Sequence, residues 1–283
     1  MTSQAEWIGA TFTDQLLGNV EAKGRDADLG AEVQNHTVVA FVGMDFEAKI
    51  AAGPGVLVVD RSRRRELAAV ARTAARQGCR GFISFGVAGG LAPHLRAGDL
   101  VVASAVIEQQ TITPTDSGWS SRLIDTLGAA SYAPIAGVEN PLSEPAVKRD
   151  LHRATGAAAV DMESHTVARL AAAHGLPFAA VRVVIDPAER TVPPAALAGM
   201  NPDGRTNTAA VLREIVARPA QLLPLMRVAL DAFAARAELV RVRRVLGSHF
   251  ALSKPAEIET ASRQEAASLS LQGLQQIELA PQH

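Results

Sequence analysis

The chain has 283 residues, which is enough for one or two domains with a sizeable hydrophobic core. Its 28 Lys and Arg residues against 29 Asp and Glu residues give a net charge of −1, which excludes a polybasic nucleic-acid surface. Hydrophobic residues make up 48% and aromatic residues 4% of the chain, so we expect a globular protein that does not bind bases mainly by aromatic stacking.

Cysteine content and hydropathy together predict a cytoplasmic location. The single cysteine, Cys79, cannot form an internal disulfide, and we expect its thiol to be buried and structural rather than catalytic. The first residues lack a basic region followed by an apolar signal core, and the longest stretch without a charged residue, 81–95, is too short for a span of about 20 residues. No histidine pair has helical ligand spacing, so no metal site and no cofactor are predicted.

Taken in chain order, the hydrophobic pattern alternates between strands and helices. Short continuous apolar runs, typical of strands buried on both faces, occur at 38–43, 56–60, 81–86, 99–107 and 178–185, and a further strand is predicted at 156–160. Helices are predicted at 61–78, ending at Gly78, and at 144–155, 164–175 and 205–246. The last of these helices is expected to break near Pro219 and Pro224.

This alternation predicts an α/β fold with a single domain, in which helices flank a central mixed, mostly parallel sheet. The domain is expected to span residues 37–247, between an N-terminal tail at 1–36 and a polar C-terminal tail at 248–283. In such sheets, ligands bind where loops leave the carboxyl ends of the strands.

Carboxylates follow three of the predicted strands. Asp45 and Glu47 lie just past the first strand, and Asp186 ends the last one. Asp161 and Glu163 lie between a strand and a helix, where either could simply favour the helix N-terminus. Any one of these acids could be a cap or a solvated charge, but three strand ends that each offer a carboxylate predict a shared cleft.

A glycine-rich segment, FGVAGG at 85–90, follows another strand. Its glycines allow backbone amides to approach a ligand, although a plain tight turn is an equally good interpretation. The spacing differs from a dinucleotide fingerprint, and no P-loop lysine follows.

These segments together resemble the nucleoside phosphorylase and nucleosidase superfamily. SFGVAGGLAPHLRAGDLVV resembles its glycine-rich segment, and AVDMESHTVARLAAAHGLPFAAVRVVID resembles its ribose segment followed by the strand of the catalytic Asp. FVGMDFEAKI resembles the first-strand segment of methylthioadenosine/S-adenosylhomocysteine nucleosidases. The segment RTVPPAALAGMNPDGRTNTAAVL resembles further the hopanoid-associated phosphorylase branch, which is implied to remove adenine from adenosylhopane.

The resemblance implies a role for each of these residues. Asp186 matches the acid that protonates the purine ring nitrogen, and Glu47 matches the residue that positions and deprotonates water. Glu163 matches the carboxylate that holds the ribose, with Met162 packing on the sugar. Gly89 and Val87 are expected to line the pocket for base and ribose, and base-facing residues are expected in the loop 138–142. The resemblance also implies a nucleoside substrate and a homodimer or larger homo-oligomer.

Departures from the family pattern bear on the acceptor. Ile185 stands where nucleosidases usually have a Ser that orients the acid, so the partner of the acid must lie elsewhere. Val87 occupies a position that usually carries a hydroxyl, and Ser84 stands where phosphorolytic relatives have an Arg. Since a phosphate dianion normally needs Arg clamps or several donors, water is favoured as acceptor. Phosphorolysis stays open if Lys49 or Arg61 replaces the missing arginines.

Two other interpretations stay open at this stage. A non-catalytic nucleoside-binding domain would need no water-handling acid, and the presence of both Glu47 and Asp186 argues against it. Alternatively, the three carboxylates could bind Mg²⁺, since hard cations favour oxygen ligands.

The segment 222–246 predicts a contact with a membrane and a lipid-linked substrate. Leu222, Leu225, Met226, Ala229, Phe233, Arg236 and Val240 follow helical spacing. Five arginines against Asp231 and Glu238 give this segment a net charge of +3, in contrast to the −1 of the whole chain. Basic amphipathic helices bind anionic membranes, although an ordinary packed helix with a solvated face has the same pattern.

Overall fold

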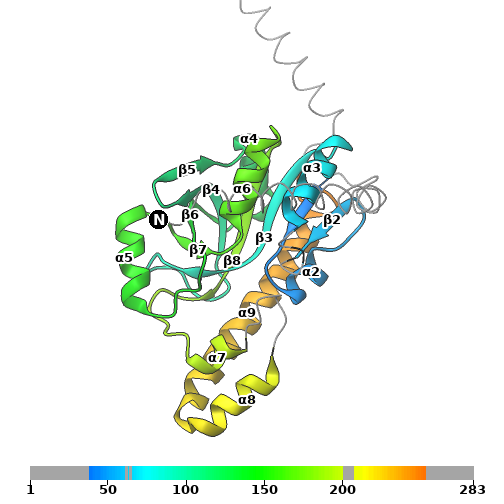
Figure 1. The fold of residues 1–283 in the computed structure, drawn as a ribbon. Coiled ribbons are helices and arrows are strands. Elements are labelled where there is room, and N and C mark those ends of the chain that lie inside the picture. Colours follow the sequence, from blue (N-terminus) through cyan, green and yellow to red (C-terminus); the bar gives the residue numbers. More distant parts are fainter. Residues whose placement is uncertain (1–37, 61–62, 64–65, 200–206, 253–283) are drawn as a thin grey trace, which may run out of the picture.

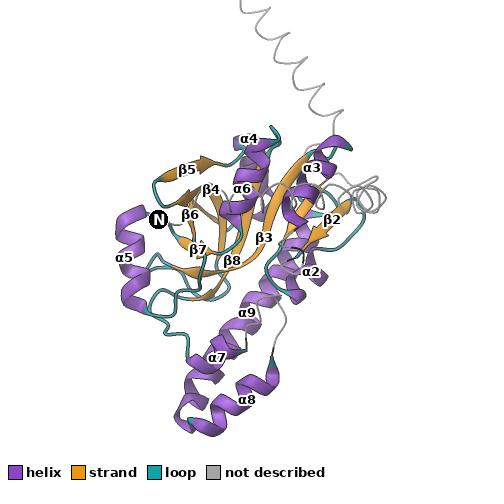
Figure 2. Cartoon of the chain, viewed as in Figure 1, coloured by secondary structure: helices purple, strands orange, loops and turns teal. Residues whose placement is uncertain are grey.

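The structure, a computed structural model, describes residues 38–60, 63, 66–199 and 207–252. The predicted N-terminal tail, and the predicted C-terminal tail from residue 253 onward, lie outside these residues. In chain order the elements are β1 (Val38–Phe41), α2 (Asp45–Ala51), β2 (Val56–Val59), α3 (Leu67–Arg76), β3 (Gly81–Gly90), β4 (Leu100–Glu108), β5 (Thr111–Pro114), α4 (Ser117–Leu127), β6 (Ser131–Gly137), α5 (Pro145–Thr155), β7 (Ala159–Asp161), α6 (Ser164–Ala173), β8 (Phe178–Asp186), α7 (Pro194–Ala198), α8 (Thr208–Ala217), η2 (Pro219–Gln221) and α9 (Leu222–Leu246) (Figures 1 and 2).

The strands form one mixed sheet in which parallel pairs predominate, and the predicted fold class is confirmed. Strands β3, β8, β4, β6 and β7 each pair with the next, and β7 pairs back with β3, so these five strands close into a ring. Strands β1 and β2 extend the sheet in parallel from β3, and β5 pairs antiparallel with β4. The carboxyl ends of β1, β3 and β8 therefore meet at one edge of the sheet.

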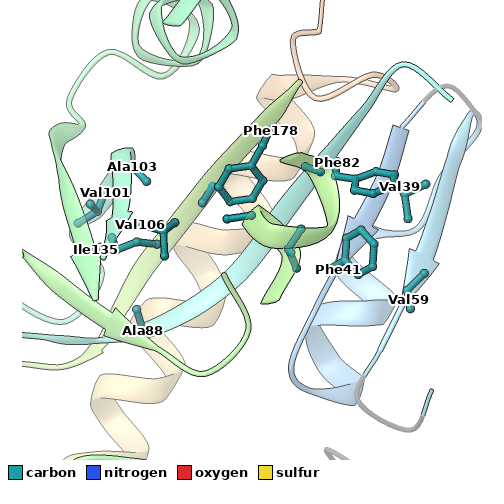
Figure 3. Packing of buried hydrophobic residues seen from close by; sticks show 14 of the residues in the cluster. Val39, Phe41, Val59, Phe82, Ala88, Val101, Ala103, Val106, Ile135 and Phe178 are labelled. Carbon is teal, nitrogen blue, oxygen red and sulfur yellow. The ribbon is translucent and has the colours of Figure 1, made fainter. Parts of the chain in front are cut away.

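Helices cover both faces of this sheet and divide the hydrophobic core into two large clusters. Helices α3 and α6 pack on one face, where the rings of Phe41 and Phe82 meet edge to face with their centroids 5.2 Å apart (Figure 3). Helices α2, α4 and α9 pack on the other face. Cys79 is buried in the first cluster, and burial raises the pKa of its thiol to about 11, which agrees with the predicted structural role.

Several elements differ from the sequence-based expectation. Strand β3 continues through the predicted glycine-rich loop as far as Gly90. Helix α9 runs unbroken through Pro224, because this residue lies in the first helical turn, where the backbone N–H has no partner within the helix. Helices α2, α4 and α7 and strands β5 and β6 were not predicted.

The end of the described chain packs against the domain. Phe250 is buried, its ring meets that of Phe85, and its carbonyl oxygen accepts a 2.7 Å hydrogen bond from Trp119 Nε1. Residues 248–252 thus anchor the C-terminal end of α9 on α4. Every helix in the described ranges is too short or too polar to cross a bilayer.

Candidate active site

A cavity of about 250 Å³ opens at the carboxyl ends of β1, β3 and β8. All six residues to which the sequence assigned a role line it: Glu47, Val87, Gly89, Met162, Glu163 and Asp186. Val138, Pro141 and Leu142 of the predicted base-facing loop also belong to its wall. The fold thus brings together residues that are up to 139 positions apart in the chain (47 and 186).

Glu47 is held at the first turn of α2 by backbone donors. Its Oε2 accepts hydrogen bonds from the N–H groups of Gly43 at 2.7 Å and Met44 at 2.8 Å, and its Oε1 accepts one from Val87 at 2.7 Å. The residue is only 2% exposed. Burial raises the pKa of Glu47 above its usual 4.5, and Arg182 and the three backbone bonds oppose that rise. The carboxyl group is therefore fixed in place with its charge only partly compensated, as a proton acceptor requires.

The glycine at position 86 makes this arrangement possible. A Cβ at Gly86 would overlap Glu47 Oε1 and would come within 2.7 Å of Arg182 Nη1. Only a residue without a side chain lets the carboxylate lie against strand β3. The segment 86–90 thus does bring the backbone close to the site, but as part of a strand rather than as a free loop.

Arg182 lies beneath the acids, fully buried in the middle of β8. It donates to Asp161 Oδ2 at 2.5 Å, to Ser84 Oγ at 2.5 Å and to Ser164 Oγ at 3.1 Å. Its Nη1 is buried and has no hydrogen-bond partner within the described residues. A buried donor of this kind normally binds a water molecule or a ligand atom.

Asp161 and Glu163, only the second of which the resemblance gave a role, have different environments. Asp161 accepts from the backbone N–H and hydroxyl of Ser164 and from Arg182, so it binds the first residue of α6 and neutralises the buried guanidinium. Glu163 Oε2 lies 4.0 Å from Arg182 Nη2, and Glu163 lines the cavity next to Met162. A Cβ at Gly43 would lie 2.9 Å from Glu163 Oε1, so β1 and α6 approach each other closely here.

Asp186 reaches the cavity through an irregularity at the end of β8. Ala88 pairs with Val184 but Gly89 pairs with Asp186, so Ile185 is an extra residue in β8 and the strand is bulged. The partner of the acid, for which the sequence offered no candidate, is Lys148 of α5, whose Nζ donates to Asp186 Oδ2. Burial raises the pKa of Asp186 to about 6, and Lys148 opposes this rise. The carboxyl group therefore holds a proton at higher pH than an ordinary Asp, as a general acid requires.

The outer wall of the cavity is apolar and is built largely by other elements. Beyond the loop 138–142 it contains Val192, Ala196 and Leu197 from the segment around α7, and Val228 from α9. Figure 1 shows that α7, α8 and the first half of α9 project beyond the sheet at this side. The cavity thus has four carboxylates at its inner end and aliphatic side chains at its outer end.

Sequence reasoning missed Lys148 and Arg182. Arg182 carried a signal, because a charge inside the apolar run FAAVRVVI must find a buried partner. Lys148 carried none, since it looks like an ordinary charge on an amphipathic helix. Lys49 was wrongly considered for anion binding: it is exposed and lines a separate surface hollow with Arg243. Arg61 lies outside the described residues.

A second polar cluster lies away from the carboxylates of the cavity. Glu108, Glu139 and His165 place one ligand atom each within 4.8 Å of the others, which the sequence could not show because they are far apart in the chain. Arg169 donates to both carboxylate oxygens of Glu108. The cluster is thus an ion-pair network between β4, the loop after β6, and α6.

Comparisons with known proteins agree with this architecture. The family model described as "Phosphorylase superfamily" matches residues 62–217, more than half of the chain. No curated protein matches the sequence.

Solved structures that align with TM-scores of 0.50 and 0.51 have the same fold. A mutant methylthioadenosine nucleosidase of Helicobacter pylori with 5′-methylthioadenosine in its active site aligns with a TM-score of 0.51 and 16% identity, over 74% of this chain and 98% of that chain. The 5′-methylthioadenosine/S-adenosylhomocysteine nucleosidase of Helicobacter pylori with butyl-thio-DADMe-Immucillin-A aligns with a TM-score of 0.50 and 16% identity over the same shares. The futalosine hydrolase of Helicobacter pylori has a TM-score of 0.46 and 16% identity, over 53% of this chain and 88% of that chain. Since the family match runs from α3 to the end of α8 and includes the glycine-rich strand β3, the chain belongs to the phosphorylase superfamily.

Proposed function

We propose that the protein hydrolyses the N-glycosidic bond of a 5′-substituted adenosine and releases adenine. The observation that carries this proposal is that Glu47, Glu163 and Asp186, from three different parts of the fold, line one cavity. Cleavage of this bond builds positive charge on the ribose and negative charge on the leaving base. An inverting glycosidase meets the same demand with one acid and one base on opposite sides of the sugar.

Each carboxyl group has an environment that suits one role. Asp186, with its pKa raised to about 6, donates a proton to the purine ring nitrogen as the bond to C1′ breaks. Glu47 accepts a proton from the attacking water, and the charge of Arg182, beneath the cavity wall, favours the ionised form of Glu47. Glu163 holds the ribose hydroxyls and stabilises the developing cation, and Met162 packs on the sugar.

The charges around the cavity favour water over phosphate as acceptor. Among the described residues, the cavity wall contains four carboxylates and no Lys or Arg side chain. Arg182 lies beneath this wall and is already engaged by Asp161, Ser84 and Ser164. A phosphate dianion would face this excess of negative charge without an Arg clamp.

The apolar outer wall supports a large aliphatic 5′ substituent. Val192, Leu197 and Val228 would contact a hydrocarbon group that leaves the ribose on the side away from the acids. With the resemblance to the hopanoid-associated branch, this supports adenosylhopane as the substrate and ribosylhopane as the product. The 5′ substituent of methylthioadenosine would contact only a small part of this wall.

We also propose that the helical projection contacts a lipid surface. Its apolar side chains with the greatest exposure are Leu212 and Val216 of α8 and Leu222, Leu223, Met226, Leu230 and Phe233 of α9. Phe233 is 73% exposed, whereas α9 packs on the domain through its opposite face with Leu239, Val242 and Leu246. The predicted apolar stripe of α9 is thus its outer face. Arg227, Arg236, Arg241 and Arg244 are exposed on the same helix.

One incubation tests the reaction and the substrate together. The protein is given methylthioadenosine or a long-chain 5′-alkyl adenosine, with and without phosphate, and adenine release is followed. We expect faster release from the long-chain substrate, phosphate-independent rates and a free reducing ribose. A ribose 1-phosphate product with phosphate-dependent rates would establish a phosphorylase instead. The Asp186→Asn variant should lose about 10²- to 10⁴-fold in turnover, and more than a tenth of wild-type turnover would contradict the role of Asp186.

Sedimentation with anionic liposomes tests the lipid contact. We expect pelleting at low salt, release as salt rises, and loss of pelleting when Met226 and Phe233 are replaced by Ser. Arg243 is not replaced in this test, because it supports the fold: it donates to Ala51 O at 2.8 Å and lies over the ring of Phe250. A protein that never pellets and prefers methylthioadenosine would contradict both the lipid contact and the lipid-linked substrate. Light scattering of the purified protein tests the proposed homo-oligomer.

A further inference from the structure

Lys148 is a lysine in a place where lysines are seldom found. Its side chain is 0% exposed, while the neighbouring Val147 is 48% exposed, so α5 buries the charged residue and presents the apolar one to solvent. Burying an ammonium group costs several kcal/mol unless it is paired and hydrogen-bonded. The burial of Lys148 in place of Val147 therefore implies that polar partners surround its ammonium group.

All three N–H donors of the ammonium group are used by the protein. Nζ donates to Asp186 Oδ2, to the carbonyl of Pro187 at 3.0 Å and to the carbonyl of Arg190 at 3.1 Å. An ammonium group has three donors and no acceptor, so none is left for a substrate atom. Lys148 is consequently a positioning residue, which ties the acid and the chain that follows it, residues 187–190, to α5.

We propose that Lys148 fixes the carboxyl group of Asp186 so that Oδ1 alone carries the proton that is transferred to the base. The inference rests on the proposed function, in which Asp186 is the general acid. Because Oδ2 accepts from Nζ, a proton on the neutral carboxyl group resides on Oδ1. When that proton passes to the purine ring nitrogen, the electrons of the C1′–N bond pass to the base. Asp186 is left as a carboxylate beside the Lys148 ammonium group, which stabilises it where it forms.

The other charges near Asp186 largely cancel one another. Asp231 of α9 and Arg190 after β8 both act on Asp186, and they form an ion pair with Arg190 Nε 2.8 Å from Asp231 Oδ2. Among the charged groups that act on Asp186 in the described part of the chain, Lys148 is the strongest cation. Lys148 is thus a side-chain partner of the acid in a chain that has Ile185 where the resemblance implied a Ser. An ammonium group differs from a hydroxyl in that it also changes the pH at which the acid ionises.

Kinetics of the Lys148→Met variant against pH test the inference. Methionine keeps the length of the stem but removes the charge and the donors. Since a nearby opposite charge lowers a carboxyl pKa by about 1 to 3 units, the alkaline limb of kcat/KM should move up by at least about one pH unit. The kcat below that limb should fall about 10-fold or more, as expected when acid–base catalysis is impaired. The Lys148→Arg variant keeps the charge, and its limb should stay near the wild-type position.

A merely structural role gives a different result. Loss of folded protein would scale the rate equally at every pH and leave the limb unmoved, and that outcome for Lys148→Met would overturn the inference. If Lys148→Met does not fold, Lys148→Gln is the second neutral variant, and the wild type provides a direct measurement. The ¹⁵Nζ resonance of Lys148 should shift as Asp186 titrates near pH 6 and should not shift in Asp186→Asn. A resonance without that shift also overturns the inference, whereas an active Asp186→Asn variant would overturn the proposed function itself.

Discussion

Replacing Glu47 by Gln tests the environment of the water-handling acid most directly. The side chain keeps its shape, but a carboxylate that accepts three backbone hydrogen bonds becomes an amide with one oxygen and one NH₂ group. The oxygen of the amide can accept from Gly43 and Met44, as Oε2 does now. The NH₂ group then faces the N–H of Val87, which donates to Oε1 at 2.7 Å in the wild type. Two donors meet there, so the buried N–H of Val87 loses its acceptor.

The expected loss of stability follows from the hydrogen bond that is lost at Val87. One buried donor without a partner costs about 1–3 kcal/mol, so the free energy of unfolding should fall by that amount. The protein should still fold, because typical domains have a stability of about 5–15 kcal/mol. Turnover should fall about 10²- to 10⁴-fold, since the amide cannot accept the proton of the attacking water. In activation free energy this loss is about 3–5 kcal/mol.

Adenine release at saturating substrate and urea unfolding measure the two quantities separately. The KM should change little, because Glu47 is proposed to act on the water and not on the ribose. Glu163→Gln, by contrast, should raise KM and also lower kcat. Asp45→Asn is the matched control, since Asp45 lies in the same helical turn but outside the cavity wall. A Glu47→Gln variant that keeps more than a tenth of wild-type turnover while folded would refute the reasoning.

Three further predictions follow from the same contacts. The pH profile of kcat/KM should be bell-shaped. It should rise at a pH above 4.5 as Glu47 loses its proton, because burial raises the pKa of Glu47, and it should fall near pH 6 as Asp186 loses its proton. A flat profile between pH 4 and 8 would contradict both assignments. Gly86→Ala should lower kcat about 100-fold or more, because its Cβ displaces the Glu47 carboxylate, and crystallography of the variant would show whether that displacement occurs. Trp119→Phe leaves the buried carbonyl of Phe250 without its donor and should lower the free energy of unfolding by about 1–3 kcal/mol in urea titrations, while an unchanged midpoint would show that the end of α9 is held by other contacts.

The fold was predictable where the sequence is apolar and continuous. Strands β1, β2, β3 and β8 are buried almost throughout, so their composition alone identified them. Strand β5 is mostly exposed and is only four residues long, and β6 contains Pro134, so neither gives a clear pattern. The glycines of β3 suggested a loop because glycine is rare inside strands, and the closeness of Glu47 and Arg182 explains why Gly86 is there.

The candidate site was predictable through its acids and not through its cations. Carboxylates at strand ends converge because parallel strands end at one edge of the sheet. Lys148 comes from α5 and reaches Asp186 sideways, through a contact that depends on how this helix is rotated about its axis. A single sequence does not specify that rotation when the residue beside the buried one is as apolar as Val147.

The division of the cavity between two sets of elements has an evolutionary consequence. The acids belong to strand ends and first helical turns, which are fixed by the closed ring of strands and by buried ion pairs. The aliphatic wall belongs to the segment around α7, to α9 and to the loop 138–142, none of which carries one of the four acids. Under the proposed function, mutations in the wall can therefore change which nucleoside is accepted while the bond-breaking chemistry persists. Divergence within this superfamily can thus proceed by substitutions in the aliphatic wall. A directed-evolution library confined to Val192, Leu197 and Val228 would explore new substrates at little risk to catalysis.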